Sequence, residues 1–115
     1  MKQELYEIRE TLISPQGNGD SFQVAIYFDL EKAKQVLDEI EQNLIEESRD
    51  LTQTWSGIIK NRGYSYDSTM NKSTVEYSIW EVITEDDEVV DAIDTENGFT
   101  FDINDFDRIQ DEIIE

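Results

Sequence analysis

The sequence predicts a single α+β domain, in which an antiparallel sheet packs against a long amphipathic helix and a short C-terminal helix. Apolar residues alternate with polar ones in several segments, as in strands with one buried face, whereas one segment has the apolar spacing of a helix. The expected strands do not alternate regularly with helices, as a parallel sheet would require. The 115 residues fit one domain, residues 1–115, because no change in composition marks a second one.

The first two elements are expected to be strands joined by a turn. Residues 5–13 alternate in polarity, although their apolar spacing would also suit a short helix. Residues 14–21 contain the only proline of the chain and several other turn-forming residues. A second alternating strand follows, so the two strands are expected to form a hairpin. The apolar positions of the second strand are Phe22, Val24, Ile26 and Phe28.

The long helix is expected at about residues 30–48. Asp29 precedes it and can act as its N-cap, since the carboxylate can accept hydrogen bonds from backbone N–H groups of the first turn. Apolar residues then recur three or four positions apart, which places them on one face of a helix. These residues are Ala33, Val36, Leu37, Ile40 and Leu44.

The second half of the chain is expected to contain further strands. Residues 51–66 give a weaker signal, but their threonines, isoleucines and Trp55 favour a strand. Residues 74–84 predict a long strand with apolar residues at both parities, so that either both faces are covered or a bulge exchanges them. A turn at residues 85–88 is expected to lead into a returning strand at residues 89–93.

Two further signals concern the end of the chain. Asn97 and Gly98 predict a tight hairpin turn, because both residue types tolerate a positive φ, and the last strand then includes Phe99. Asn104 or Asp105 is expected to cap a final helix. That helix would carry on one face Phe106, Ile109 and Ile113.

The composition excludes several classes of function. With no Cys, the chain cannot form disulfides, thiolate metal sites or a cysteine nucleophile, and with no His it lacks the usual general base. No apolar run approaches the roughly 20 residues that span a bilayer, and residues 1–4 do not resemble the start of a signal peptide. The net charge of −19 disfavours direct binding to nucleic acids or anionic membranes. We therefore expect a cytoplasmic, non-catalytic protein that binds another protein.

The acidic residues are concentrated toward the C-terminus. Residues 85–115 contain 13 of the 28 acidic residues and one basic residue, Arg108. Like charge at this density destabilises a compact state, so a function for it is expected. Carboxylates two residues apart on a strand, or one turn apart on a helix, are separated by about 5–7 Å, which is similar to the spacing of phosphates along a nucleic-acid strand. The candidate phosphate-mimicking surface comprises Glu85, Asp86, Asp87, Glu88, Asp94, Asp102, Asp105, Asp107, Asp111 and Glu112.

The acidic residues could also serve other roles. The charge can serve solubility alone, on a solvated face. A calcium loop that starts at Asp94 would need Gly at its sixth position and Glu at its twelfth, but Gly98 is fifth and Asp105 is twelfth, so no metal site is expected. Pairs of carboxylates can hydrolyse glycosides, but 28 acidic residues produce suitable pairs by chance. No cofactor is expected, because no glycine-rich phosphate loop is present.

In its size, its α+β pattern and its acidic residues 85–88 and 102–115, the chain resembles a class of small, cysteine-poor, strongly acidic phage-encoded inhibitors. This class includes anti-CRISPR proteins and anti-restriction DNA mimics. The resemblance implies action in the host bacterial cytoplasm, on the basic nucleic-acid groove of a CRISPR effector nuclease or another DNA-processing protein, without catalysis by the inhibitor. The alternative is an acidic interaction domain that binds through an apolar patch or homodimerises, with its charge serving solubility.

Overall fold

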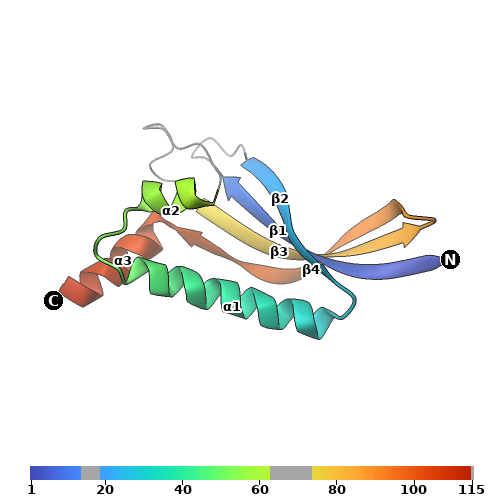
Figure 1. Ribbon diagram of the computed structural model, residues 1–115, viewed down its shortest axis with the longest axis horizontal. Helices are drawn as coiled ribbons and strands as arrows, with labels where there is room; N and C mark the ends of the chain where they lie inside the picture. The colour runs from blue at the N-terminus through green and yellow to red at the C-terminus, as the bar shows by residue number, and fades with distance from the viewer. Residues whose placement is uncertain (14–18, 63–73, 115) are drawn as a thin grey trace.

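The computed structural model describes residues 1–13, 19–62 and 74–114, which form four strands and three helices (Figure 1). The strands form one sheet in the order β2-β1-β3-β4, and every neighbouring pair is antiparallel. The predicted α+β class is therefore confirmed. The elements in chain order are β1 (Lys2–Ile13), β2 (Gly19–Tyr27), α1 (Leu30–Ser48), α2 (Trp55–Asn61), β3 (Thr74–Glu85), β4 (Glu88–Asp102) and α3 (Ile103–Ile114).

β1 and β3 form the centre of the sheet, and their pairing is regular along both strands. All 12 residues of β1 pair with β3, with Ile8 opposite Ile79 and Leu12 opposite Val75. Residues directly opposite each other share a face of the sheet, and these four side chains are at most 4% exposed. Both central strands agree with the sequence prediction. Their buried face is the one on which the hydrophobic core is built.

β2 pairs with the other side of β1 and is the edge strand there. The pairing changes register once, because Ala25 lies opposite Ile8 whereas Gln23 lies opposite Arg9, so Val24 is an extra residue. The predicted strand is confirmed, but much of the turn predicted at residues 14–21 falls outside the described residues, which resume at residue 19.

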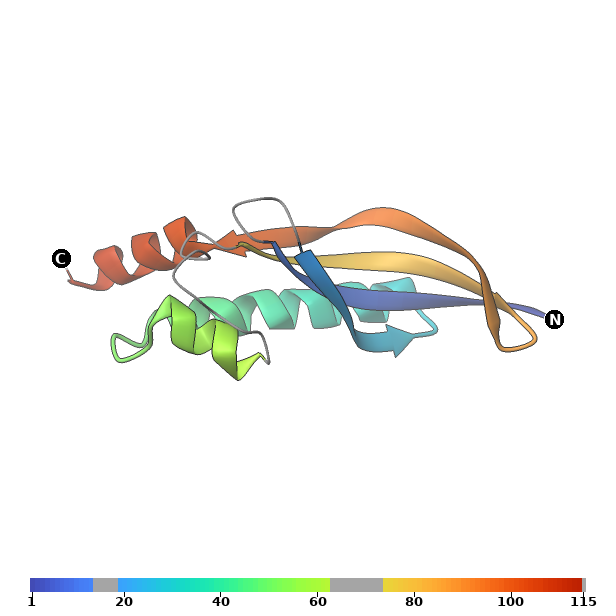
Figure 2. The ribbon, with the colours of Figure 1, turned by 90° about the horizontal axis from the view of Figure 1, so that it is seen from above.

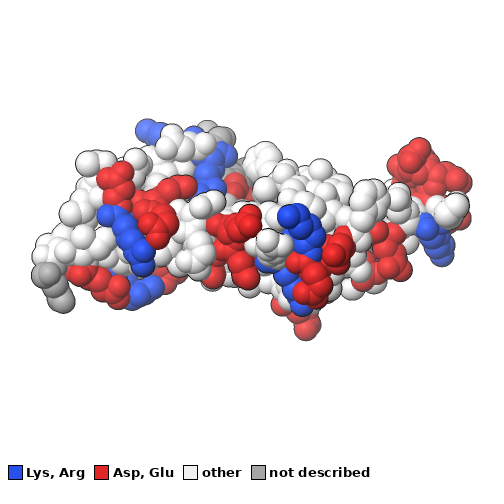
Figure 3. All heavy atoms as spheres, turned by 60° about the horizontal axis from the view of Figure 1, so that its bottom comes forward, with Lys and Arg blue, Asp and Glu red and all other residues white. Residues whose placement is uncertain are grey.

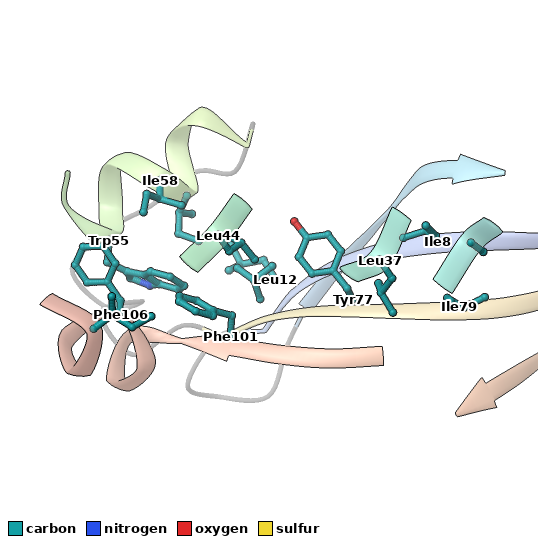
Figure 4. Packing of buried hydrophobic residues seen from close by; sticks show 14 residues of the cluster. Ile8, Leu12, Leu37, Leu44, Trp55, Ile58, Tyr77, Ile79, Phe101 and Phe106 are labelled. Carbon is teal, nitrogen blue, oxygen red and sulfur yellow. The ribbon is translucent and has the colours of Figure 1, made fainter. Parts of the chain in front are cut away.

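α1 covers part of the sheet face that carries the core (Figure 1). Asp29 is its N-cap and accepts a hydrogen bond of 3.1 Å from the backbone N–H of Glu31, as predicted. Ala33, Leu37 and Leu44 are buried against the sheet, where they meet side chains of β1 and β3 (Figure 4). The predicted long helix and its apolar face are therefore confirmed.

The segment that follows α1 is a helix, and the strand predicted there is wrong. The Thr54 side chain caps α2 by accepting a hydrogen bond of 3.1 Å from the backbone N–H of Gly57. Trp55, Ile58 and Ile59 are buried, at the spacing of one helical face. The cap and this burial outweigh the β propensity of the individual residues.

Trp55 of α2 joins the C-terminal helix to the core (Figure 4). Its ring stacks on Phe101 at 6.0 Å between centroids and packs against Phe106 of α3 at 5.9 Å. The Gln110 side chain adds hydrogen bonds of 3.2 and 3.3 Å to the carbonyl oxygens of Asp50 and Gln53. These contacts hold α2 and α3 against the same end of the sheet.

The start of α3 differs from the prediction by two or three residues. The Asp102 carboxylate accepts hydrogen bonds from the backbone N–H groups of Asn104 and Asp105, at 2.9 and 3.1 Å. The Asp105 carboxylate accepts in return from the backbone N–H of Asp102, at 3.2 Å. This reciprocal pattern is a capping box, so the cap is Asp102. Phe106 and Ile109 are buried as predicted, but Ile113 is 41% exposed.

The chain reverses only once between β3 and β4, and the hairpin predicted at Asn97 and Gly98 is wrong. The reversal lies at Asp86 and Asp87, whose φ values are 52° and 67°. Two residues with positive φ are what a two-residue hairpin turn of type I′ requires, and Asp tolerates this conformation better than most residues do. β4 then continues without a break to Asp102.

Gly98 is explained by a close approach of backbones instead of by a turn. A Cβ atom at Gly98 would lie 2.3 Å from the carbonyl oxygen of Tyr77 on β3. Next to it, β4 has two extra residues, because Asn97 lies opposite Ile79 whereas Asp94 lies opposite Trp80. A residue without a side chain is needed where the bulged strand meets β3 again.

A polar network with little solvent exposure joins α1 and α2 to the sheet. Arg62, the C-cap of α2, lies 3.6 Å from the carboxylate of Glu10 and donates a hydrogen bond of 3.0 Å to the hydroxyl of Tyr77. The Tyr77 hydroxyl donates to Glu10, and the Arg62 guanidinium also lies 3.3 Å from Glu47 of α1. Glu10 is 8% exposed, and these contacts compensate the burial of its charge.

Substitution of Gly98 tests the close approach of β4 to β3. Gly98→Ala is expected to lower the free energy of unfolding by about 1–3 kcal/mol, because the added methyl group forces the two backbones apart. Thr100→Ala, at an exposed position of the same strand, is the control and is expected to cost less than about 1 kcal/mol. Urea unfolding followed by circular dichroism measures both values. Equal stability of the two variants would contradict the close approach.

Substitution of Arg62 tests the polar network. Arg62→Met is expected to lower the free energy of unfolding by on the order of 3 kcal/mol, because it removes the cation beside a buried carboxylate. Arg49→Met removes an exposed ion pair with Glu46 and is expected to change stability by less than about 1 kcal/mol. Adding Glu10→Gln to Arg62→Met is expected to restore part of the loss. A double variant that is as unstable as the additive sum would rule out this coupling.

Candidate functional site

The sheet is longer than the helix that covers it. The 19 residues of α1 span about 28 Å. The 12 residues of β3, which pair with β1 and β4 along their whole length, span about 40 Å, in a molecule 56 Å long. One end of the sheet therefore projects beyond α1 (Figures 1 and 2). We call this end the projecting arm, and it consists of residues 2–7 of β1, 80–85 of β3 and 88–94 of β4.

The projecting arm continues the core-bearing face of the sheet without a helix over it. The pairing register shows which of its side chains share this face, because directly opposite residues lie side by side and alternate residues repeat along a strand. The residues on this face are Lys2, Glu4 and Tyr6 of β1, Glu81, Ile83 and Glu85 of β3, and Glu88, Asp91 and Ile93 of β4.

Five of these nine residues are acidic. We call Glu4, Glu81, Glu85, Glu88 and Asp91 the acidic arm face. A bulge contributes to this arrangement: Val89 lies opposite Thr84 and Asp91 opposite Ile83, so the extra residue Val90 keeps Glu88 and Asp91 on one face. Figure 3 shows acidic side chains gathered at this end of the molecule.

The electrostatic field of these carboxylates acts on Tyr6, which lies among them. Burial raises the pKa of the Tyr6 hydroxyl above its usual value, and the charges of Glu81, Glu4 and Asp29 raise the pKa further. Tyr6 lies directly opposite Glu81. Carboxylates from three separate segments of the chain thus impose a negative potential at one point of the arm.

Among the described residues, the ion pairs of Lys and Arg involve acids outside the acidic arm face, although Lys2 lies on that face, directly opposite Glu85. The residues that form ion pairs through Lys or Arg are Glu7, Glu10, Glu31, Glu46, Glu47 and Glu112. On the hairpin, the one ion pair among the described residues joins Asp86 to the N-terminal ammonium group at 3.9 Å, with both groups at least 90% exposed. Glu85 and Glu88 lie directly opposite each other, a placement in which like charges repel. The five carboxylates of the acidic arm face therefore outnumber its one cation, Lys2, and none of them forms an ion pair with Lys or Arg among the described residues.

The opposite face of the arm supplies its packing. The Arg9 guanidinium lies over the Trp80 ring at 4.7 Å from the centroid, and the Trp80 indole N–H donates a hydrogen bond of 3.1 Å to the Ser78 hydroxyl. Val82 follows on the same face and is only 4% exposed. Trp55, in contrast, belongs to the main core. The sequence favours a core or an interface for Trp80, and in the structure its half-buried ring packs against Arg9 on this face of the arm.

The acidic residues proposed from the sequence fall into separate groups. Residues 85–88 form the tip of the arm, whereas α3 lies at the other end of the molecule (Figures 1 and 2). Asp94 lies on the opposite face of the arm from Glu88 and accepts a hydrogen bond of 2.8 Å from the backbone N–H of Glu96. The structure therefore does not assemble the ten residues into one row.

The C-terminal members of the proposed set have identifiable local contacts. Asp102 and Asp105 cap α3. On α3, Glu112 pairs with Arg108 at 3.1 Å, and both flank a shallow hollow of about 330 Å³ together with Asp107 and Asp111. Asp107 and Asp111 are exposed and make no ion pair among the described residues.

Sequence reasoning missed three members of the acidic arm face. Glu4 and Glu81 lie outside the acidic C-terminal segment, and Asp91 lies within it but was not chosen. Only the antiparallel register places them beside Glu85 and Glu88. The available signal was the alternation of Glu81, Ile83 and Glu85 along one strand, which places carboxylates on a single face.

The described residues contain no group of three or more acidic side chains arranged to hold a metal ion. None of their helices has the length and apolar character needed to cross a membrane. Comparison of the chain with models of protein families, with curated proteins and with solved structures yields no match. The geometry of the molecule is therefore the basis for a functional proposal.

The repulsion on the acidic arm face is expected to be measurable in the free protein. Glu88→Gln should raise the free energy of unfolding at low salt by less than about 1 kcal/mol, because it removes a like charge opposite Glu85. The gain should shrink in about 1 M NaCl, where the screening length is about 3 Å. Glu112→Gln removes the ion pair with Arg108 and should give no such gain. Thermal melts at several salt concentrations compare the variants, and a gain that is independent of salt would contradict the repulsion.

Proposed function

We propose that the protein is a non-catalytic inhibitor that occupies the basic nucleic-acid groove of a CRISPR effector nuclease or another DNA-processing protein. The acidic arm face, with the hairpin tip beside it, is the contact surface in this proposal. The observation that carries the proposal is the presence of five carboxylates on three adjacent strands, with no Lys or Arg ion pair to any of them among the described residues. Guanidinium and ammonium groups of a groove would form charge-assisted hydrogen bonds with these oxygens.

The charge spacing supports mimicry of a phosphate backbone. The acidic arm face extends along β3 from Glu85 to Glu81, a distance of four residues or about 14 Å. Its five carboxylates and the Lys2 ammonium sum to four negative charges, or one about every 3–4 Å along the strand. One strand of duplex DNA carries a phosphate charge about every 3.4 Å along the helix axis. The whole molecule carries −19 over a length of 56 Å.

The shape of the arm also supports entry into a groove. The arm is a narrow sheet of three strands at the end of an elongated molecule of 56 × 28 × 21 Å (Figure 2). Backbone pairing on both sides of β3, regular with β1 and interrupted in the arm by one bulge at Val90 of β4, holds its carboxylates at fixed separations. A preorganised set of charges loses less conformational entropy on binding than charges on a flexible tail would.

The partner can be captured by exposing the immobilised chain to lysate from a bacterium that carries CRISPR and restriction systems. Duplex DNA is expected to elute a nucleic-acid-binding complex, because the two compete for one groove. Salt is expected to elute the same complex, because screening weakens charge-assisted contacts. If no complex is released by DNA, the proposed mimicry is wrong.

Three charge-matched variants then locate the contact. The arm variant carries Glu85→Gln, Glu88→Gln and Asp91→Asn, and the α1 variant carries Asp38→Asn, Glu39→Gln and Glu41→Gln. A third variant neutralises α3 at Asp107, Asp111 and Glu112. All three change the net charge equally, so they separate position from total charge.

The arm variant is expected to bind the captured complex about tenfold or more weakly than the unmodified chain, whereas the α1 variant changes affinity little. Thermal melts check that each variant is folded. Equal losses in the arm and α1 variants would indicate a response to total charge, and full affinity of the arm variant would exclude the acidic arm face. A loss confined to the α3 variant would place the contact at the other end of the molecule.

A further inference from the structure

The edge of the sheet formed by β2 differs from the edge formed by β4. β2 is the last strand on its side, and among the described residues only β1 pairs with it. Within the part of the chain that the structure describes, its outer backbone groups therefore pair with no other strand. Charged residues, prolines and bulges are the features that protect such an edge from association. β2 has one bulge, at Val24, but no proline and no charged residue after Asp20.

Three apolar side chains line the outer part of this strand and the residue after it. Val24 is 45% exposed, Ile26 is 40% exposed and Phe28 is 74% exposed. Ala25 and Tyr27 lie on the core-bearing face of the sheet, opposite Ile8 and Tyr6, and Tyr27 packs against the core. Ile26 lies opposite Glu7, on the face of the sheet that is turned away from the core. The apolar alternation expected for this strand is interrupted by the extra residue Val24, and the side chains of Val24, Ile26 and Phe28 are exposed instead of buried.

The charge distribution favours a second copy of this chain as the partner of the β2 edge. β2 contains a single charged residue, Asp20, at its beginning, and residues 21–28 are uncharged. β4 carries five carboxylates, on Glu88, Asp91, Asp94, Glu96 and Asp102. Two copies with a net charge of −19 each repel one another, and of the two sheet edges only that of β2 lets them approach without placing rows of carboxylates together.

We propose that two copies of this chain pair through β2, antiparallel and about a two-fold axis. A two-fold interface buries the same residues from both copies, so an uncharged apolar strand is complementary to itself. The product is a continuous sheet of eight strands, in which Val24, Ile26 and Phe28 of each copy lie at the junction. The strands at the junction run in opposite directions, so the two projecting arms point to opposite ends of the dimer. This pairing is independent of the proposed inhibitor function and leaves both acidic arm faces exposed.

The dependence of association on salt distinguishes this dimer from a contact held by charge. Sedimentation equilibrium of the full chain is carried out over a range of protein concentrations, from about 0.1 to about 1 M NaCl, where the screening length falls from about 10 to about 3 Å. We expect the dimer to become tighter as salt rises, because the interface is apolar and the repulsion between the copies is screened. A chain that stays monomeric throughout, or a dimer that dissociates as salt rises, overturns the proposal.

Two variants with the same substitution locate the interface. Ile26→Lys is expected to raise the dissociation constant of the dimer about tenfold or more, because a lysine on an edge strand must lose its hydration when the edge is covered. Val89→Lys introduces the same side chain at a position that is 65% exposed on the opposite edge strand, and the dimer should persist. Circular dichroism confirms the fold of both variants. Persistence of the dimer in Ile26→Lys, or its loss in Val89→Lys, places the contact elsewhere.

Amide hydrogen exchange gives a second readout that needs no substitution. Backbone N–H groups of β2 that do not pair with β1 should exchange more slowly at protein concentrations at which the dimer forms. The amides of β4 should show no such change. Protection that appears at β4 instead, or no change at either edge on dimer formation, contradicts pairing through β2.

Discussion

The architecture depends on a mismatch in length between the sheet and the helix that covers it. An α-helix rises about 1.5 Å per residue and a strand about 3.3 Å, so α1 with 19 residues is shorter than β3 with 12. A hydrophobic core can form only where α1, α2 and α3 cover the sheet. Beyond that region the sheet is held by its own pairing and by Trp80 and Val82 on its other face. Carboxylates that are exposed there keep their hydration, so they do not carry the desolvation cost that burial imposes.

Charged groups under the helices are paired, whereas those on the projecting arm lie beside groups of like charge. Inside, Arg62 compensates the charge of Glu10 and connects α2 to Tyr77 of the sheet. On the projecting arm, the described residues place like charges beside one another, and the pKa of Tyr6 is raised by burial together with that negative potential. The two edges of the sheet differ in a related way, since β4 is acidic and the outer part of β2 is apolar. These differences underlie two separate proposals: one for a basic partner at the arm, and one for a second copy at β2.

Most of the fold was predictable where one local pattern dominated. The apolar spacing in α1 and the alternation in β1 and β3 each repeat over many residues, so a single exception does not change the prediction. α2 was predicted as a strand because its residues have high β propensity, whereas the Thr54 cap and the burial of Trp55 decided the outcome. Gly98 was assigned to a turn because Asn-Gly often forms one, whereas it provides room for the backbone of Tyr77. Neither contact can be read from neighbouring residues alone.

The sequence by itself determined the composition of the candidate site: a strongly acidic chain without Cys or His, most acidic after residue 84. It also determined the α+β class, because periodicity is a local property of the chain. The tertiary structure decided which carboxylates are neighbours. Glu4, Glu81 and Asp91 meet only through the antiparallel register, and the bulge at Val90 keeps Asp91 on the same face as Glu88. Register depends on pairing between segments that are distant in the chain, and a shift of one residue would move every side chain of a strand to the opposite face.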